Sequence, residues 1–172
     1  RFDNVTGVQT CALPISEVKD INSPSVTEGE KLVFDITVDK PAADTEINLT
    51  LKGITATLGS DTGLPIEIST DGGASWTTVT LDANGKFTAT VPAGSTKGVK
   101  VRIPTVDDGV VEGNETLTLE AAAKGQATPL TGTGTISDGA APVPNAEVKD
   151  INSPSVTDRK STRLNSSHII ES

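Results

Sequence analysis

The stretch Lys31–Asp39 (KLVFDITVD) alternates apolar and polar side chains with a period of two. Its apolar members, which all fall on one side of an extended chain, are Leu32, Phe34, Ile36 and Val38. A strand that buries one face in a core and leaves the other in water has this pattern. The stretch therefore predicts a half-buried β-strand.

The same alternation recurs on both sides of this stretch. It is seen in Glu46–Lys52, Lys86–Val91, Val99–Ile103 and Thr116–Ala121, with shorter candidates at Ile66–Ile68, Trp76–Val79 and Leu130–Ile136. Turn sequences such as Asp71-Gly72-Gly73 and Asn84-Gly85 separate them, and no segment has a convincing helical period. Seven to nine short strands in about 110 residues predict an all-β protein, an Ig-like antiparallel two-sheet β-sandwich. Its core must be mainly aliphatic, because aromatic residues are few.

An exact internal repeat indicates how the chain is organised. Glu17–Thr27 (EVKDINSPSVT) recurs letter for letter at Glu147–Thr157, which gives a period of 147 − 17 = 130 residues. Solenoid repeats run at roughly 20 to 50 residues, so a unit of this length has a core of its own. We predict a tandem array, with one repeat at 16–138, a linker at 139–146 containing Pro142 and Pro144, and the start of the next repeat at 147–157.

The two ends of the chain have a relation that protein selection does not produce. Residues equally distant from the two termini can be encoded by complementary codons at all fifteen outer positions. Asp158–His168 (DRKSTRLNSSH) and Val5–Ile15 (VTGVQTCALPI), for example, can be read from opposite strands of one DNA segment. This pairing resembles a translated sequencing adapter. We therefore interpret 1–15 and 158–172 as adapter-derived and exclude them from the fold prediction.

The remaining residues limit the possible chemistry. Cys11 and His168, the only cysteine and histidine, lie in the excluded ends, so residues 16–157 cannot form Cys–His or Ser–His catalytic pairs or Cys/His zinc sites. Those residues contain 20 acidic and 10 basic side chains, a net charge near −10. Such a surface repels nucleic acid and anionic lipid, and no apolar run approaches the roughly 18 residues of a membrane span. We expect divalent cations as partners.

The densest acidic segment is Asp107–Glu115 (DDGVVEGNE), with four carboxylates in nine residues. A solvated acidic turn would have this composition. So would a loop that binds calcium, which accepts six to eight oxygen ligands from flexible segments. Composition alone leaves both interpretations open.

Three motifs together resemble a Calx-beta domain. They are Val26–Gly29 (VTEG), Asp107–Leu117 (DDGVVEGNETL) and Gly132–Asp138 (GTGTISD), and the similarity extends over Ser25–Asp138. The resemblance implies a non-enzymatic, calcium-binding extender repeat of a large bacterial surface or RTX-type adhesin. It also implies an extracellular location, a role in cell adhesion or biofilm, and adjacent repeats as neighbours.

The resemblance further implies a set of calcium ligands at one pole of the sandwich. Carried over to this sequence, they are Glu28, Asp61, Asp107, Asp108, Glu112, Glu115 and Asp138. The family often closes with several aspartates, whereas Asp138 is followed here by Gly139 and Ala140. This difference favours one or two Ca²⁺ ions with dissociation constants on the order of 10⁻⁴ to 10⁻³ M, as in extracellular modules.

A second motif, Ser69–Trp76 (STDGGASW), fits the Asp-box pattern S-x-D-x-G-x-[ST]-W of sialidase-like propellers. We interpret it as a hairpin turn in which Asp71 binds backbone N–H groups, the glycines take positive φ, and Trp76 packs on the turn. A sialidase would need several boxes and an arginine cluster, and residues 16–157 contain one box and one arginine, Arg102. The alternative function is a glycan- or protein-binding module, or an accessory domain of a secreted hydrolase, that uses the Asp71–Trp76 turn.

Overall fold

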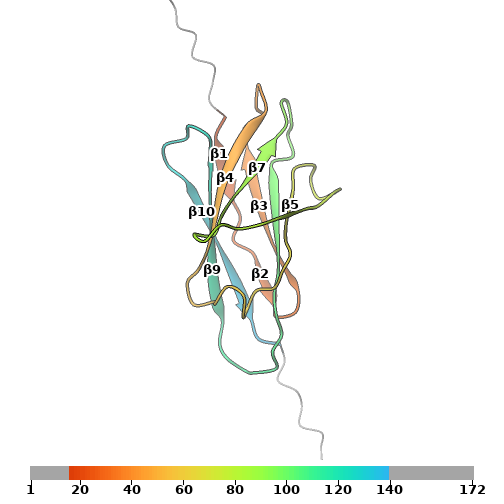
Figure 1. The fold of residues 1–172 in the computed structure, drawn as a ribbon, viewed down its shortest axis with the longest axis vertical. Coiled ribbons are helices and arrows are strands. Elements are labelled where there is room, and N and C mark those ends of the chain that lie inside the picture. The colour runs from red at the N-terminus through yellow and green to blue at the C-terminus, as the bar shows by residue number, and fades with distance from the viewer. Residues whose placement is uncertain (1–15, 140–172) are drawn as a thin grey trace, which may run out of the picture. The chain divides into compact units, whose positions relative to one another are not determined.

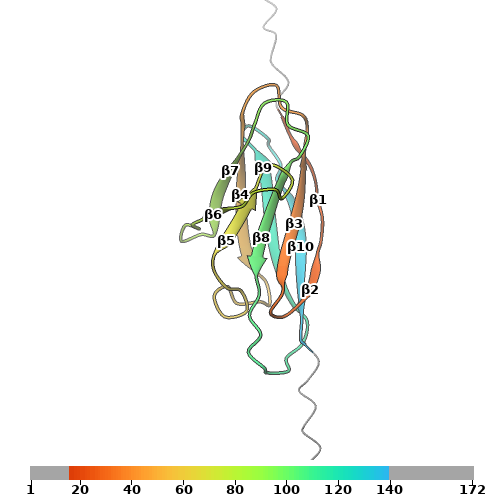
Figure 2. The same cartoon turned by 90° about the vertical axis from the view of Figure 1, so that its right-hand side faces the viewer.

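The computed structural model describes residues 16–139, and they form two β-sheets packed face to face (Figures 1 and 2). The first sheet has the order β1 (Val18–Ile21), β3 (Lys31–Val38), β8 (Val99–Pro104), β5 (Ile66–Ser69), β6 (Thr77–Val79). The second has the order β2 (Ser25–Thr27), β10 (Leu130–Ser137), β9 (Glu115–Ala123), β4 (Thr45–Gly53), β7 (Lys86–Val91). The predicted all-β sandwich is confirmed. None of the described residues forms a helix long and apolar enough to cross a bilayer.

The alternating segments form strands whose apolar side chains meet between the sheets. In β3, Leu32 and Phe34 are fully buried and lie opposite Ile103 and Val101 of β8. Fully burying one such side chain contributes about 1.5–3 kcal/mol. Two of the three aromatic residues in the described part, Phe34 and Phe87, belong to this mainly aliphatic core. The third, Trp76, is half-exposed and lies outside it.

Two glycines of β10 allow the sheets to approach each other closely. A Cβ on Gly134 would lie 2.5 Å from Cδ2 of Leu32 and 2.9 Å from Cζ of Phe34. A Cβ on Gly132 would lie 2.4 Å from the carbonyl oxygen of Asn22. The two glycines lie on the same, buried face of β10, where Gly134 makes room for core side chains and Gly132 makes room for the first segment of the repeat.

The first segment of the repeat is divided between both sheets, and residues 16–139 contain ten strands instead of the expected seven to nine. Its first part, β1, pairs antiparallel with β3, and its second part, β2, pairs with β10 in the one parallel ladder between the strands given above. The intervening residues Asn22–Pro24 cross from one sheet to the other. The predicted adapter-derived ends, the linker after Gly139 and the repeat copy at 147–157 lie outside the described residues.

Candidate metal centre at one pole of the sandwich

The strand topology brings the predicted ligands to one end of the sandwich. Glu28 follows β2, Asp107, Asp108 and Glu112 lie in the connection between β8 and β9, and Glu115 begins β9. The parallel partners β2 and β10 end side by side, with Thr27 opposite Ser137. Asp138 therefore follows β10 next to Glu28, whose N–H donates to the carbonyl of Ser137 at 2.9 Å.

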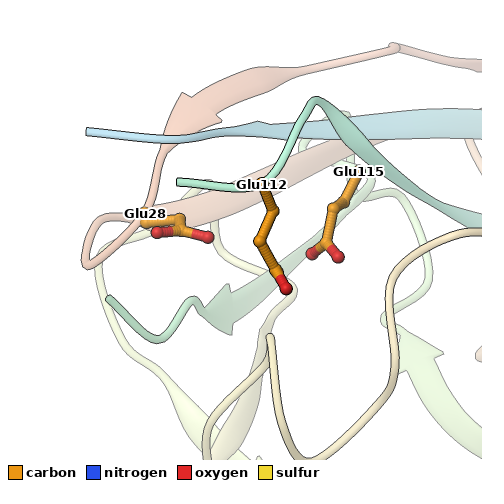
Figure 3. A group of neighbouring side chains, drawn as sticks. All are labelled: Glu28, Glu112 and Glu115. Atoms are coloured by element: carbon orange, nitrogen blue, oxygen red, sulfur yellow. The ribbon is translucent and has the colours of Figure 1, made fainter. Parts of the chain in front are cut away.

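Three glutamates form the centre of this acidic pole. Glu28, Glu112 and Glu115 each offer a carboxylate oxygen, and these oxygens lie within 4.8 Å of one another. Figure 3 shows the three side chains pointing toward a common region. Glu28 and Glu115 are half-buried and Glu112 is exposed. This spacing would allow one cation to contact all three carboxylates.

The other four predicted ligands surround the three glutamates. Asp107, Asp108 and Asp138 lie close enough to Glu28 to affect its ionisation, and Asp61 affects that of Glu115. Asp107 and Asp108 accept hydrogen bonds from the backbone N–H groups of Gly109 and Val110, at 3.0 and 2.8 Å, which order their loop. All seven carboxylates thus belong to one electrostatic cluster.

The ionisation of the cluster shows how poorly its negative charge is compensated. Burial raises the pKa of Glu115 to about 7, and the neighbouring carboxylates of Asp61, Glu112 and Glu28 add to the rise. Burial, followed by the charges of four neighbouring acids, also raises the pKa of Glu28. Within residues 16–139, no lysine or arginine forms an ion pair with any of the seven predicted ligands.

Two carboxylate oxygens of the cluster, Oε2 of Glu115 and Oδ1 of Asp138, are inaccessible to solvent and receive no hydrogen bond from a described residue. A buried acceptor without a donor costs free energy, more so when it is charged. Coordination to a cation would offset that cost.

Threonines that the sequence analysis did not single out hold the loops of this pole together. The N–H and hydroxyl of Thr105 donate to the carbonyl of Glu30 at 2.9 and 2.8 Å, which joins the end of β8 to the β2–β3 turn. The carbonyl of Thr116 accepts the N–H groups of residues 54–56, which fixes the segment leading toward Asp61. Thr105 continues the alternation of β8 as a buried polar residue, and that position could have identified it.

Asp61 is positioned by its own turn and by the end of β8. Its side chain accepts the N–H of Thr57, and its N–H donates to the carbonyl of Thr57 at 3.0 Å. Its carbonyl accepts the N–H of Val106 at 3.1 Å. Asp61 thus stands beside the acidic loop although 46 residues of sequence, 107 − 61, separate it from Asp107.

The Asp-box segment forms the turn that the sequence predicted, between β5 and β6. Asp71 accepts hydrogen bonds from the hydroxyl of Ser75, from the N–H of Ser75 at 3.0 Å and from the hydroxyl of Ser69 at 2.7 Å, and these hydrogen bonds hold its pKa well below the usual range. Gly72 and Gly73 have φ values of 84° and 98°. The Arg102 guanidinium lies 4.1 Å from the centre of the Trp76 ring.

A shallow groove of about 760 Å³ crosses the outer face of the second sheet, away from the acidic pole. Small polar side chains line much of it, among them Asn48, Thr50 and Thr88. Phe87 is the aromatic residue in its lining, and that side chain is buried in the core. The acidic pole, rather than this groove, is therefore the candidate functional site.

Comparison with known proteins gives a partial likeness in structure only. No family model matches the chain, and no curated protein matches it. A cohesin–dockerin complex from Clostridium thermocellum matches with a TM-score of 0.42 and 11% identity over 69% of this chain and 92% of that one. A module named CaCohA2 from Clostridium acetobutylicum gives 0.41 and 13% over 69% and 88%. A cohesin module of a Clostridium perfringens family 33 glycoside hydrolase gives 0.40 and 12% over 73% and 98%. Likeness of this degree carries no assignment of function.

Proposed function

We propose that this chain is a non-enzymatic, calcium-binding spacer repeat of a tandem-repeat protein at a bacterial surface or in the extracellular medium. The observation that carries the proposal is the convergence of seven carboxylates, with two buried oxygens lacking donors, at the pole where β10 ends. The resemblance of the three sequence motifs to Calx-beta repeats supports the same function. The 130-residue repeat supports the role as one unit of an array.

The donor set favours calcium over other cations. It consists of carboxylate oxygens carried by loops and strand ends, without nitrogen or sulfur donors from histidine or cysteine in the described residues. Calcium accepts six to eight such oxygens in flexible geometry, whereas magnesium demands a near-ideal octahedron and gives up water reluctantly. Zinc prefers nitrogen and sulfur ligands. We therefore expect Ca²⁺ to bind more tightly than Mg²⁺.

We infer the role of the ion in the proposed array from the position of the pole. Asp138 is the last predicted ligand and directly precedes the linker to the next repeat. An ion that bound both Asp138 and Glu28 would fix the start of the linker against the β2–β3 turn. The proposed function is thus to hold successive modules in an extended arrangement.

Calcium titration by calorimetry on the full chain, with melting curves in calcium and in chelator, tests the proposal. We expect a dissociation constant on the order of 10⁻⁴ to 10⁻³ M. At a calcium concentration 100 times that constant, mass action adds about 2.7 kcal/mol to the free energy of unfolding. Glu112→Gln combined with Glu28→Gln should abolish both effects.

The matched control is Glu46→Gln. Glu46 is an exposed glutamate near the start of β4 and is not one of the seven predicted ligands. The substitution removes the same charge without touching the acidic pole, so binding should persist. Equal weakening by Glu46→Gln would reveal a general charge effect, and absence of any heat or thermal shift in the unsubstituted chain would sink the calcium proposal.

The alternative, recognition of a glycan or protein by the Asp71–Trp76 turn, is supported by the half-exposed Trp76 ring. However, the guanidinium of Arg102 covers that ring and is held by Glu67, with Nη2 2.6 Å from Oε2. The Trp76 ring is thus already in contact with another side chain of the same molecule. Binding to a glycan array that Trp76→Ala abolishes, with calcium affinity unchanged, would favour the alternative over the spacer.

A further inference from the structure

The segment that occupies the sheet edges at the start of the repeat exists twice in the chain. Glu17–Thr27 forms β1, the crossing and β2, and the identical Glu147–Thr157 follows the linker. We call the surface that holds Glu17–Thr27 the first-strand site: the edges of β3 and β10 with which β1 and β2 pair, together with Gln126. We propose that this site is exchangeable, and that it accepts Glu147–Thr157 from a second copy of the chain.

Hydrogen bonds to the backbone and the side chains of Glu17–Thr27 hold it in the first-strand site. Gln126 binds both backbone groups of Val18, accepting its N–H at 2.8 Å and donating to its carbonyl at 3.2 Å. The side chain of Asn22 accepts the N–H of Asp35 at 2.7 Å, and the hydroxyl of Ser23 accepts the N–H of Thr133 at 3.2 Å. These interactions fix the register of the segment as it crosses between the sheets.

Shape also selects the segment. Gly132 leaves room for the carbonyl of Asn22 and for the side chain of Ile21, whose Cγ2 would lie 2.5 Å from a Cβ at that position. The corresponding residues of the second copy are Val148, Ile151, Asn152 and Ser153. Every contact described for the first copy can therefore be made by the second.

The first copy can leave the site without dismantling the rest of the sandwich. β1 and β2 are edge strands, each paired on one side only. Of the eleven residues, only Val18 and Ile21 are buried. An exposed sheet edge is a template for an added strand, and strands of identical sequence exchange at low cost.

Chain length opposes occupation of the site by the second copy of the same molecule. Thr27 pairs with Ser137, so the far end of the site, at Glu17, lies about ten extended residues, or roughly 33 Å, from the point where β10 ends. Nine residues join Ser137 to Glu147, and ten peptide units reach at most about 33–36 Å. The linker would have to be fully stretched. A second molecule has no such restriction.

The attached first copy has an advantage over a free competitor, because a short connection gives it an effective concentration on the order of millimolar. We therefore expect monomers in dilute solution. Exchange becomes measurable where copies are crowded or where the first copy is weakened. The proposal is independent of calcium, so its test is made in chelator.

The test compares four full-length chains: unsubstituted, Ile21→Asp, Ile151→Asp, and the double variant. Ile21→Asp disables the attached strand and leaves the donor intact. We expect this chain to form dimers or longer head-to-tail assemblies in sedimentation velocity, with a melting temperature that rises with protein concentration. Ile151→Asp should remain a monomer with the stability of the unsubstituted chain.

The double variant lacks both occupants, and we expect a monomer with a lower melting temperature that does not depend on concentration. The proposal is overturned if Ile21→Asp and the double variant are equally stable and both monomeric. It is also overturned if Ile21→Asp is more stable than the double variant and still monomeric, since the second copy of the same molecule would then fill the site. The milder pair Ile21→Ala and Ile21→Ala/Ile151→Ala gives the same comparison should aspartate prevent folding.

A peptide provides a second, independent measurement. A synthetic peptide with the sequence of Glu147–Thr157 is titrated into the double variant, with a control peptide that carries aspartate at the position of Ile151. We expect the first peptide alone to raise the melting temperature. Equal effects of the two peptides, or no effect of either, would contradict a sequence-specific exchangeable site.

Discussion

At the scale of single residues, Glu115 shows most clearly the conflict between folding and charge at the acidic pole. Its backbone begins β9, and Oε2 is buried without a donor. Burial and the surrounding acids raise its pKa to about 7, from an ordinary value of 4.5. The folded chain thus retains a proton on Glu115 at pH values where the unfolded chain has lost it.

This difference predicts how stability depends on pH in the absence of divalent cations. Between about pH 4.5 and 7 the unfolded state binds fewer protons at this residue than the folded state, so the free energy of unfolding falls as pH rises. Above pH 7 both states are ionised and the loss is complete. In chelator, Glu115→Gln should make this fall in the free energy of unfolding smaller by about 1–3 kcal/mol. Denaturant unfolding at pH 5 and pH 8 measures it.

Glu115→Gln should stabilise the chain in chelator but destabilise it relative to the unsubstituted chain in calcium. The reason is that the glutamine amide is a weaker calcium ligand than the carboxylate. Glu115→Gln is expected to bind calcium more weakly than the unsubstituted chain while being more stable in chelator at pH 8. Glu46→Gln serves as the control and should alter neither quantity. An unchanged pH profile in Glu115→Gln would assign the decline to other acids.

At the scale of elements, the strands that bury one face were predictable, and the division of the first segment between the two sheets was not. β3, β4, β7, β8 and β9 alternate over six or more residues and were predicted from that pattern. β1 and β2 are only four and three residues long, and the crossing between them interrupts the period. The exact repeat marks Glu17–Thr27 as the start of a structural unit, but it carries no information about which sheet each half of the segment joins.

The candidate site was only partly predictable, for a related reason. The acidic loop at Asp107–Glu115 was visible because its carboxylates are adjacent in sequence. Glu28 and Asp61 entered the prediction through resemblance alone, since their proximity to the loop depends on strand order and on hydrogen bonds to Ser137 and Val106. The 4.8 Å convergence of Glu28, Glu112 and Glu115 is a property of the folded pole.

Sheet packing at β10 yields a prediction at the same scale. Gly134→Ala places a methyl group 2.5 Å from Leu32 and 2.9 Å from Phe34, which forces the sheets apart or the side chains out of their rotamers. We expect a loss of about 1–3 kcal/mol of unfolding free energy, as for other overpacked cores. Chemical denaturation measures the change.

Gly113→Ala is the matched control, because no atom lies within 4 Å of a Cβ placed there. It should leave the free energy of unfolding nearly unchanged. If the two variants were equally stable, the close approach of β10 to β3 would not limit the packing of the sandwich.

At the scale of the whole molecule, the described sandwich receives the chain at one pole and releases it at the other. β1 begins at the pole opposite to the acidic one, and β10 ends beside Glu28 (Figure 1). A tandem array of such modules would run pole to pole, and each junction would begin at an acidic cluster. The proposed calcium site therefore lies where it can affect the relation between neighbouring modules.

A chain of two complete repeats tests this relation. If calcium fixes the start of the linker, small-angle X-ray scattering should show a larger maximum dimension in calcium than in chelator, because the modules explore fewer bent arrangements. Glu28→Gln with Glu112→Gln should give the chelator profile in both conditions. Identical profiles for the unsubstituted chain with and without calcium would confine the ion's role to stability within the module.

The parallel pairing of β2 with β10 has a consequence for an array under tension. A pull on the two ends of the sandwich draws the first segment toward one pole and β10 toward the other, so the two strands are loaded in shear along their common axis. The interstrand hydrogen bonds must then break together rather than one after another. They belong to the pairs from Ser25–Thr135 to Thr27–Ser137 and include the Glu28–Ser137 hydrogen bond. Such a module would resist stretching most strongly at the strands where its chain enters and leaves.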